Sequence, residues 1–298
     1  MLSYRIDTEF LLPADEQGRG EIKKHLTKKH GRDDSQLIAR SILSRPIDAY
    51  VIGEGERCVL VVGAHHALES ITANIAYLLI DLLLTYSHSG VVKGIDCKLL
   101  LSKYRFIVIP CVNPDGIELR LHGVGESPLR ERQLRMSGGD FSRWQANARG
   151  VDLNHNYSVG FSEYKRIEGE RGIYPGPSLY SGEYPESEPE TKGVANLVRV
   201  LTPFAVLSLH SQGEEIYFFP GAPSVGRCAA RLSSLTGYKV AEPTDTALYG
   251  GLCDFTGAMG IPSFTYEVGK GENPLPENDI VGIFPRIAES IVLLPTLL

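Results

Sequence analysis

The fold is decided by the stretch Cys58-Val59-Leu60-Val61-Val62-Gly63-Ala64-His65-His66-Ala67-Leu68-Glu69, which precedes the apolar run from Ile71 to Thr85. The first five residues form a short apolar, β-branched run, which is typical of a buried strand. The run from Ile71 to Thr85 is almost continuously apolar and too long for a strand, so it predicts a buried helix. A buried strand that leads into a buried helix indicates an α/β protein.

The same alternation continues along the chain. Further strands are predicted at Ala49 to Gly53, Tyr104 to Ile109, Phe204 to Leu209, Glu215 to Phe219, Tyr238 to Val240 and Ser263 to Tyr266. Further helices are predicted at Asp33 to Leu43, Ser187 to about Val200, Val225 to Leu235 and Asn278 to about Leu294. The region from Arg120 to Tyr184 has weak periodicity, which indicates long irregular connections. We therefore predict one α/β domain over residues 1–298, with residues 1–45 as an N-terminal lead-in. A mixed, mostly parallel central sheet should carry helices on both faces.

Composition excludes several classes of protein. With 43% hydrophobic and 22% charged residues, the chain is not disordered or fibrous. The net charge is −6 and the one dense basic window, Lys23 to Arg32, is short, so nucleic acid is not expected as a partner. The N-terminus lacks a leader pattern and no apolar run reaches ~18 residues, so we expect a cytoplasmic protein without a membrane partner. The five cysteines form no CxxC pair, so a metal would need His and carboxylate ligands.

The residues after the first strand could bind a metal. His66 and Glu69 are three positions apart, so on one helical turn they can point the same way. Zinc hydrolases commonly use two His and one Glu and leave the fourth position to water. His65 with Glu69 is a second possible pairing. A histidine beside a helix-start carboxylate, with no metal, would give the same short pattern.

Polar residues follow three other predicted strands. His210 comes directly after the strand ending at Leu209, and Glu267 follows Tyr266. The stretch Asn113-Pro114-Asp115-Gly116 follows the strand that ends at Ile109. In open α/β sheets, ligands bind outside the carboxyl ends of the strands. These groups would converge if the strands were parallel neighbours.

These residues resemble the zinc carboxypeptidases of the carboxypeptidase A type. The matching pieces occur in the family's order over roughly residues 45–298, and they are His66-Ala67-Leu68-Glu69, Val112-Asn113-Pro114-Asp115-Gly116, Gly150-Val151-Asp152-Leu153-Asn154, Leu209-His210-Ser211 and Tyr266-Glu267-Val268-Gly269. The resemblance implies that His66, Glu69 and His210 bind one Zn²⁺ per chain and that Glu267 is the general base. The longer pieces Trp144 to Asn154, Ser187 to Thr191 and Gly250 to Phe255 look more like a bacterial branch that cleaves γ-D-glutamyl-diaminopimelate bonds in murein peptides.

The chain departs from that family where the substrate is held. Family members grip the terminal carboxylate with an Asn-Arg pair, and here the pair is Asn154-His155. Gln145 stands where the resemblance expects the Arg that polarises the scissile carbonyl. Arg143 is the nearest replacement, and His155 is an alternative donor for the oxyanion.

Four further residues have possible roles. Tyr249 is a displaced match for the family's substrate-closing Tyr, and Cys253 could line the specificity pocket or serve only for packing. Asp254 is more simply read as a carboxylate that braces a loop. Asp152 could orient a zinc-binding His through its second nitrogen or brace its own loop.

Together with the candidate ligands, the resemblance implies a zinc metallopeptidase, a hydrolase that acts on a small, cell-wall-derived peptide by a metal-activated water. Two alternatives stay open. A zinc-dependent N-acyl amino acid deacylase uses a similar set of ligands. A non-catalytic, peptide-binding member of the fold would explain the altered Asn154-His155 pair, although Glu267 is present.

Overall fold

The computed structural model describes residues 4–88, 90–244 and 247–298, and in them an eight-stranded sheet runs in the order β1-β2-β6-β3-β7-β10-β8-β9. The strands are β1 (Ser35–Arg40), β2 (Pro46–Ile52), β3 (Arg57–Val62), β6 (Tyr104–Ile109), β7 (Ala205–His210), β8 (Glu215–Phe218), β9 (Lys239–Val240) and β10 (Ser263–Glu267). The central strands β6, β3, β7 and β10 are parallel neighbours. Strands β1 and β2 on one side and β8 on the other add antiparallel pairings. A small separate hairpin pairs β4 (Val91–Val92) with β5 (Ile95–Asp96).

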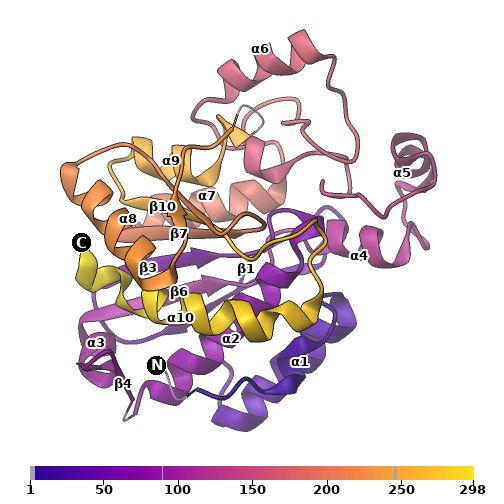
Figure 1. The fold of residues 1–298 in the computed structure, drawn as a ribbon. Helices are drawn as coiled ribbons and strands as arrows, with labels where there is room; N and C mark the ends of the chain where they lie inside the picture. Colours follow the sequence, from indigo (N-terminus) through magenta and orange to yellow (C-terminus); the bar gives the residue numbers. More distant parts are fainter. Residues whose placement is uncertain (1–3, 89, 245–246) are drawn as a thin grey trace.

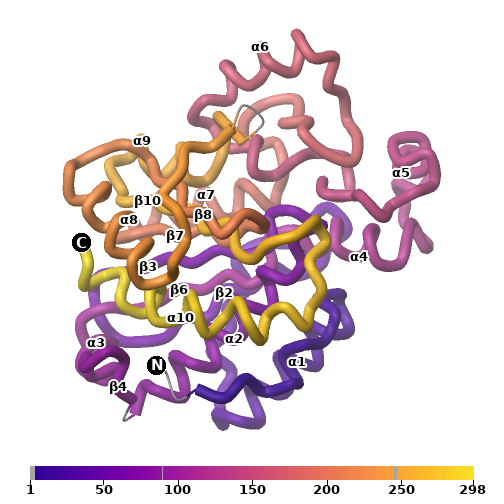
Figure 2. Tube along the Cα trace, viewed as in Figure 1, coloured from indigo at the N-terminus to yellow at the C-terminus, as the bar shows by residue number. Residues whose placement is uncertain are grey.

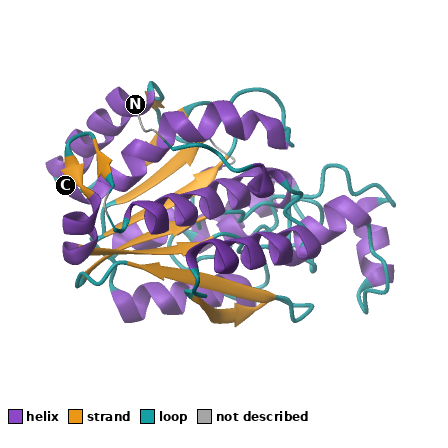
Figure 3. Ribbon diagram, turned by 90° about the horizontal axis from the view of Figure 1, so that it is seen from below, coloured by secondary structure: helices purple, strands orange, loops and turns teal. Residues whose placement is uncertain are grey.

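Helices cover both faces of this sheet, as predicted (Figure 1). One face carries α1 (Glu16–His30), α2 (Ile71–Tyr86), α3 (Cys97–Lys103), α8 (Pro223–Thr236) and α10 (Ile280–Leu297), whose buried side chains share one core cluster. The other face carries α7 (Pro189–Leu201) and α9 (Leu252–Ala258), which share a second cluster. Figure 3 shows the strands with helices packed along them. The fold is therefore a three-layer α/β domain.

Alternation along β3 explains how one strand supports both layers. Val59 and Val61 point into the cluster under α2, whereas Leu60 and Val62 point into the cluster under α7 and α9. All four side chains are fully buried. Each such side chain contributes roughly 1.5–3 kcal/mol of hydrophobic stabilisation. A one-residue slip of β3 would exchange the two faces, so packing on both sides fixes where the strand ends.

One N-terminal prediction is wrong, and one N-terminal helix was not predicted. Residues 33–43, predicted as a helix, contain β1, an edge strand that pairs antiparallel with β2. The apolar spacing of this segment fits a helix, but Leu37 is 53% exposed and the backbone pairing with β2 decides the structure. The helix α1 was missed because it buries few apolar residues, mainly Ile22 and Leu26. Residues 1–45, apart from the undescribed 1–3, therefore contribute a core helix and an edge strand.

The C-terminal helix also differs from expectation. Residues Glu277–Leu297 are long and apolar enough to cross a membrane by length and composition, whereas the sequence analysis found no such run. Of its 18-residue apolar window, 61% is buried inside the domain, and α10 packs against α8 and α2. Core helices that are mostly buried meet the same criterion.

The long connection is more ordered than predicted. It contains the end of α4 (Pro114–His122), then α5 (Arg130–Ser137) and α6 (Phe161–Arg171), with irregular chain between them. The trace in Figure 2 shows α6 above the central strands and α5 to their right, both at the periphery of the domain. Short 3-10 turns complete the description at Thr8–Leu11, Ala67–Glu69, Leu153–His155 and Glu277–Asp279.

Candidate metal centre

The parallel strands bring their C-terminal ends together, as the sequence predicted. The chain leaves β3 at Val62 and reaches His66 and Glu69, the latter in the short 3-10 turn Ala67–Glu69. On the neighbouring strands, His210 is the last residue of β7 and Glu267 is the last residue of β10, and the two are paired in register. Asn113, after β6, braces this edge by donating to the backbone oxygens of His65 and Gln145.

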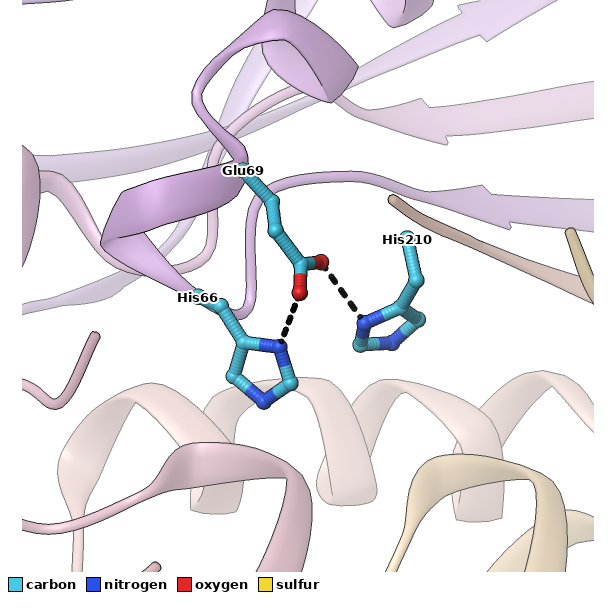
Figure 4. A group of neighbouring side chains, drawn as sticks. All are labelled: His66, Glu69 and His210. Atoms are coloured by element: carbon cyan, nitrogen blue, oxygen red, sulfur yellow. Dashed lines mark hydrogen bonds and ion pairs between the residues drawn. The ribbon is translucent and has the colours of Figure 1, made fainter. Parts of the chain in front are cut away.

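The carboxylate of Glu69 lies between two imidazole rings (Figure 4). Its Oε1 is 2.8 Å from Nδ1 of His66, and its Oε2 is 2.9 Å from Nδ1 of His210. The backbone N–H of Ser211 also donates to Oε2, at 3.2 Å. All three side chains are buried, and they offer ligand atoms that lie within 4.8 Å of one another. Two imidazole nitrogens and a carboxylate oxygen form a donor set that suits zinc.

Asp152 fixes the orientation of His66. Its Oδ1 is 3.0 Å from Nε2 of His66, and its Oδ2 accepts hydrogen bonds from the side chain of Gln145 and the backbone of Leu179. Burial alone would raise the pKa of Asp152, but the charge and hydrogen bond of His66 hold this pKa below its ordinary value. Because Nε2 of His66 faces a carboxylate, Nδ1 is the nitrogen left for a metal. The orienting role of Asp152 is thus supported by geometry.

A polar atom without a partner supports the presence of a ligand at this point. Nε2 of His210 is buried and has no hydrogen-bond partner among the residues that the structure describes. His65 does not join the cluster, because its Nε2 is 2.9 Å from the hydroxyl of Tyr157 and its ring stacks on His210. Burial and the neighbouring histidines lower the pKa of His65. Of the two pairings that the sequence left open, the structure therefore forms His66 with Glu69.

Glu267 lies beside the cluster and is only half-buried. Burial and the nearby carboxylate of Glu69 raise the pKa of Glu267 well above its usual value, against an opposing effect of His66. A carboxylate with a raised pKa, close to the metal ligands, can take a proton from water and return it.

The predicted substrate contacts lie around α9. Oδ1 of Asn154 accepts from the backbone of Leu252, and Nδ1 of His155 lies 2.8 Å from the carbonyl oxygen of Tyr249. The ring of His155 stacks on Tyr164 at 3.7 Å, so much of this residue is used in packing. Tyr249 is 40% exposed.

Cys253 and Asp254, adjacent residues in α9, have different surroundings. Burial raises the pKa of the Cys253 thiol to about 12, and Thr265 is its hydrogen-bond partner on β10. Asp254 accepts from the backbone of Gly251 and caps its own helix, as the simpler interpretation predicted.

Arg143 lies at the rim of the centre. Its guanidinium donates to Glu272 and to the carbonyl oxygen of Asn273, and Asn273 is held by two hydrogen bonds to Ser211, next to His210. The side chain of Gln145, which stands where the resemblance expects an Arg, donates a hydrogen bond to Asp152. This contact could not be predicted from the sequence, because a Gln–Asp pair seven residues apart in an irregular loop has no periodic signal.

Two stretches that resembled a bacterial branch brace one another. Asn147 and Arg149 both donate to the buried carboxylate of Glu188, at 2.7 to 3.0 Å. The carbonyl oxygen of Ser187 accepts a further bond from Arg149. This network joins the loop that carries Asp152 to the start of α7.

Comparisons with known proteins show which family the chain is similar to. The sequence model of the family described as zinc carboxypeptidase matches residues 25–249, which include His66, Glu69 and His210. The chain is 32% identical to gamma-D-glutamyl-L-diamino acid endopeptidase 1 of Lysinibacillus sphaericus over 83% of its own length and 63% of that protein. It is 33% identical to murein peptide amidase A of Escherichia coli strain K12, over 36% of each chain.

Solved structures share the fold at low sequence identity. Thrombin activatable fibrinolysis inhibitor superposes with a TM-score of 0.73 at 18% identity, covering 98% of this chain and 75% of that one. Murein-tripeptide amidase from Escherichia coli O157 gives 0.53 at 18% identity, covering 88% and 93%. Because the family model matches well over half of the sequence, over a range that includes the clustered His66, Glu69 and His210, the chain belongs to the zinc carboxypeptidase family.

Proposed function

We propose that this protein hydrolyses the γ-D-glutamyl-diaminopimelate bond of small murein peptides, with one zinc ion per chain held by His66, Glu69 and His210. The observation that carries the proposal is the placement of these three ligands beside Glu267, at the ends of three neighbouring parallel strands. When bound, zinc lowers the pKa of water and polarises a scissile carbonyl.

The residues of the chain divide the remaining work. Glu267 takes the proton of the attacking water and passes it to the leaving amine as the C–N bond breaks. Asp152 keeps His66 in the orientation that presents Nδ1. Arg143 is the candidate donor to the oxyanion, and its link to Ser211 through Asn273 keeps it near the ligands.

The substrate class rests on two features. The two most relevant relatives carry names that specify a gamma-D-glutamyl-L-diamino acid bond and a murein peptide. In addition, Gln145 and His155 stand where the resemblance expects arginines, and both are engaged by protein contacts. A plain C-terminal carboxylate therefore meets fewer fixed cationic donors here than an Arg fork provides. Asn154, Tyr249 and Cys253, around the N-terminal end of α9, complete the proposed pocket.

The test compares kcat/KM of the zinc-loaded protein for L-Ala-γ-D-Glu-meso-diaminopimelate, for N-blocked dipeptides ending in Phe or Lys, and for an N-acyl amino acid. We expect at least tenfold preference for the γ-D-glutamyl substrate. Preference for a dipeptide or for the N-acyl amino acid would contradict the proposal. His210→Ala should lose both zinc and hydrolysis, whereas His122→Ala, at a histidine paired with Asp15 on the surface, should keep both.

A further inference from the structure

The register of the sheet extends the row of site residues by one strand. His210 on β7 is paired with Glu267 on β10, and Glu267 is paired with Glu215 on β8. Residues that are directly paired across neighbouring strands point to the same face of a sheet. Neighbouring strands are about 4.8 Å apart, so Glu215 lies one strand spacing from Glu267 and two strand spacings from His210.

A second polar row lies directly behind the first. Ser208, Thr265 and Tyr217 are paired in the same way across β7, β10 and β8. Thr265 contacts the thiol of Cys253, and the hydroxyl of Tyr217 donates to Oε2 of Glu215 at 2.9 Å. The hydroxyl of Ser208 is buried and lacks a hydrogen-bond partner within the described part of the chain. The polar side chains of these two rows thus lie on one face of the sheet and extend from the metal centre to β8.

Among the residues that the structure describes, no Lys, Arg or His nitrogen forms an ion pair with Glu215. The hydroxyl of Tyr217 is the side-chain donor that contacts its carboxylate. The adjacent Glu214 pairs with both Lys270 and Arg286. A partly buried carboxylate that stands beside a second carboxylate, Glu267, is electrostatically unfavourable unless a cation lies close to it. The uncompensated charge is therefore well suited to a cationic group of the substrate.

We propose that Glu215, oriented by Tyr217, binds the ammonium group on the side chain of the leaving amino acid and so selects a diamino acid at that position. The inference rests on the proposed function for the direction of the substrate. Glu267 returns the proton to the leaving amine, and Glu215 is the next residue beyond Glu267 on the side away from His210. The side chain of the leaving residue therefore extends along the row towards Glu215.

The test measures binding and turnover separately on three matched ligands. Meso-diaminopimelate carries the distal ammonium and carboxylate, 2-aminopimelate carries the carboxylate alone, and lysine carries the ammonium alone. Calorimetric titration of the zinc-loaded protein gives the affinity for each, and kcat/KM is measured on the three corresponding γ-D-glutamyl amides. We expect diaminopimelate to bind about 10- to 100-fold more tightly than 2-aminopimelate, as one charge-assisted hydrogen-bond pair allows.

Three variants identify the residue responsible. Glu215→Gln should reduce the preference for diaminopimelate over 2-aminopimelate to within about threefold, through KM rather than kcat. Tyr217→Phe should reduce it partly, since the carboxylate remains but loses its orienting bond. Glu214→Gln is the matched control and should leave the preference unchanged.

The outcomes separate the two proposals. If Glu215→Gln keeps the preference for diaminopimelate over 2-aminopimelate, or weakens the binding of both equally, Glu215 does not bind the ammonium group and the inference is overturned. If the parent protein binds diaminopimelate through Glu215 but hydrolyses none of the γ-D-glutamyl amides, the proposed function fails while the inference stands. Hydrolysis of all three amides at similar rates, with no preference in binding, would overturn the inference alone.

Discussion

Replacing Asp152 by Asn tests whether the metal centre depends on the carboxylate that holds His66. Asp152 is fully buried and accepts four hydrogen bonds, two at each oxygen. Oδ1 faces Nε2 of His66 and the backbone N–H of Asn154, and Oδ2 faces Gln145 and the backbone N–H of Leu179. An amide has one oxygen, so Asp152→Asn can serve only one of these two sides.

The size of the effect follows from the contacts that are lost. If the amide oxygen stays on His66, the new NH₂ group faces the donor of Leu179, since Gln145 can rotate but a backbone N–H cannot. One buried donor left unsatisfied costs about 1–3 kcal/mol of the free energy of unfolding. The variant also loses the negative charge opposite His66, and loss of such a supporting carboxylate typically weakens metal binding about 10- to 100-fold.

The assay is zinc affinity by competition with a fluorescent chelator, with urea unfolding of the metal-free protein in parallel. Asp115→Asn is the matched control, because Asp115 is equally buried but its partners are Ser41, Leu43 and Arg45. We expect both variants to lose stability and only Asp152→Asn to lose zinc affinity. An unchanged zinc affinity in Asp152→Asn, or an equal loss in the control, would refute the reasoning.

Three further predictions concern the base, a buried acid and the core. Glu267→Gln should keep zinc but lower kcat about 10²- to 10⁴-fold, since an amide cannot accept the proton, and a rate within tenfold of the parent would exclude Glu267 as the base. Burial raises the pKa of Glu190 from 4.5 to about 8, although hydrogen bonds from the backbone N–H groups of Glu190 and Ile42 act in the opposite direction. The contribution of Glu190 to the free energy of unfolding is therefore complete below about pH 4.5 and is lost as the pH rises through about 8. This contribution is at most about 5 kcal/mol. The urea midpoint of Glu190→Gln should accordingly vary less between pH 5 and pH 8.5 than that of the parent, and an equal pH dependence would contradict this origin. Leu79→Ala should lower the free energy of unfolding by about 2–5 kcal/mol, because Leu79 is fully buried in α2, whereas Val200→Ala, at a residue 81% exposed, should change it by less than about 0.5 kcal/mol.

The central sheet and the metal ligands could be predicted because their signals are local and repeated. Each parallel strand is a short apolar run, and the polar residues of interest stand at its C-terminal end or within a few residues after it. The strand order need not be known in detail for this inference, since parallel strands deliver their C-terminal ends to one edge. Position therefore makes His66, Glu69 and His210 candidate ligands, the resemblance implies that they form the ligand set, and the structure brings them together.

The N-terminal elements and the supporting contacts could not be predicted in the same way. Strand β1 is defined by its pairing with β2, and its apolar spacing favours a helix when it is considered alone. Gln145 and Asp152 meet in an irregular loop, where sequence spacing says little about side-chain direction. The row that ends at Glu215 depends on which strand follows β10 in the sheet, and that order appears only in three dimensions.

The balance of charge at the edge of the sheet connects these observations. Four carboxylates lie at this edge, those of Glu69, Asp152, Glu267 and Glu215. His66 contacts Glu69 and Asp152, and His210 contacts Glu69. At the positions where the resemblance expects arginines, Gln145 is neutral and His155 is stacked against Tyr164. An excess of negative charge at a half-buried site favours cationic ligands, because nearby opposite charges stabilise the ionised carboxylates. A divalent metal at the ligands and an ammonium group at Glu215 would offset this excess at its two ends. A substrate that offers only a terminal carboxylate would increase the excess of negative charge at this site.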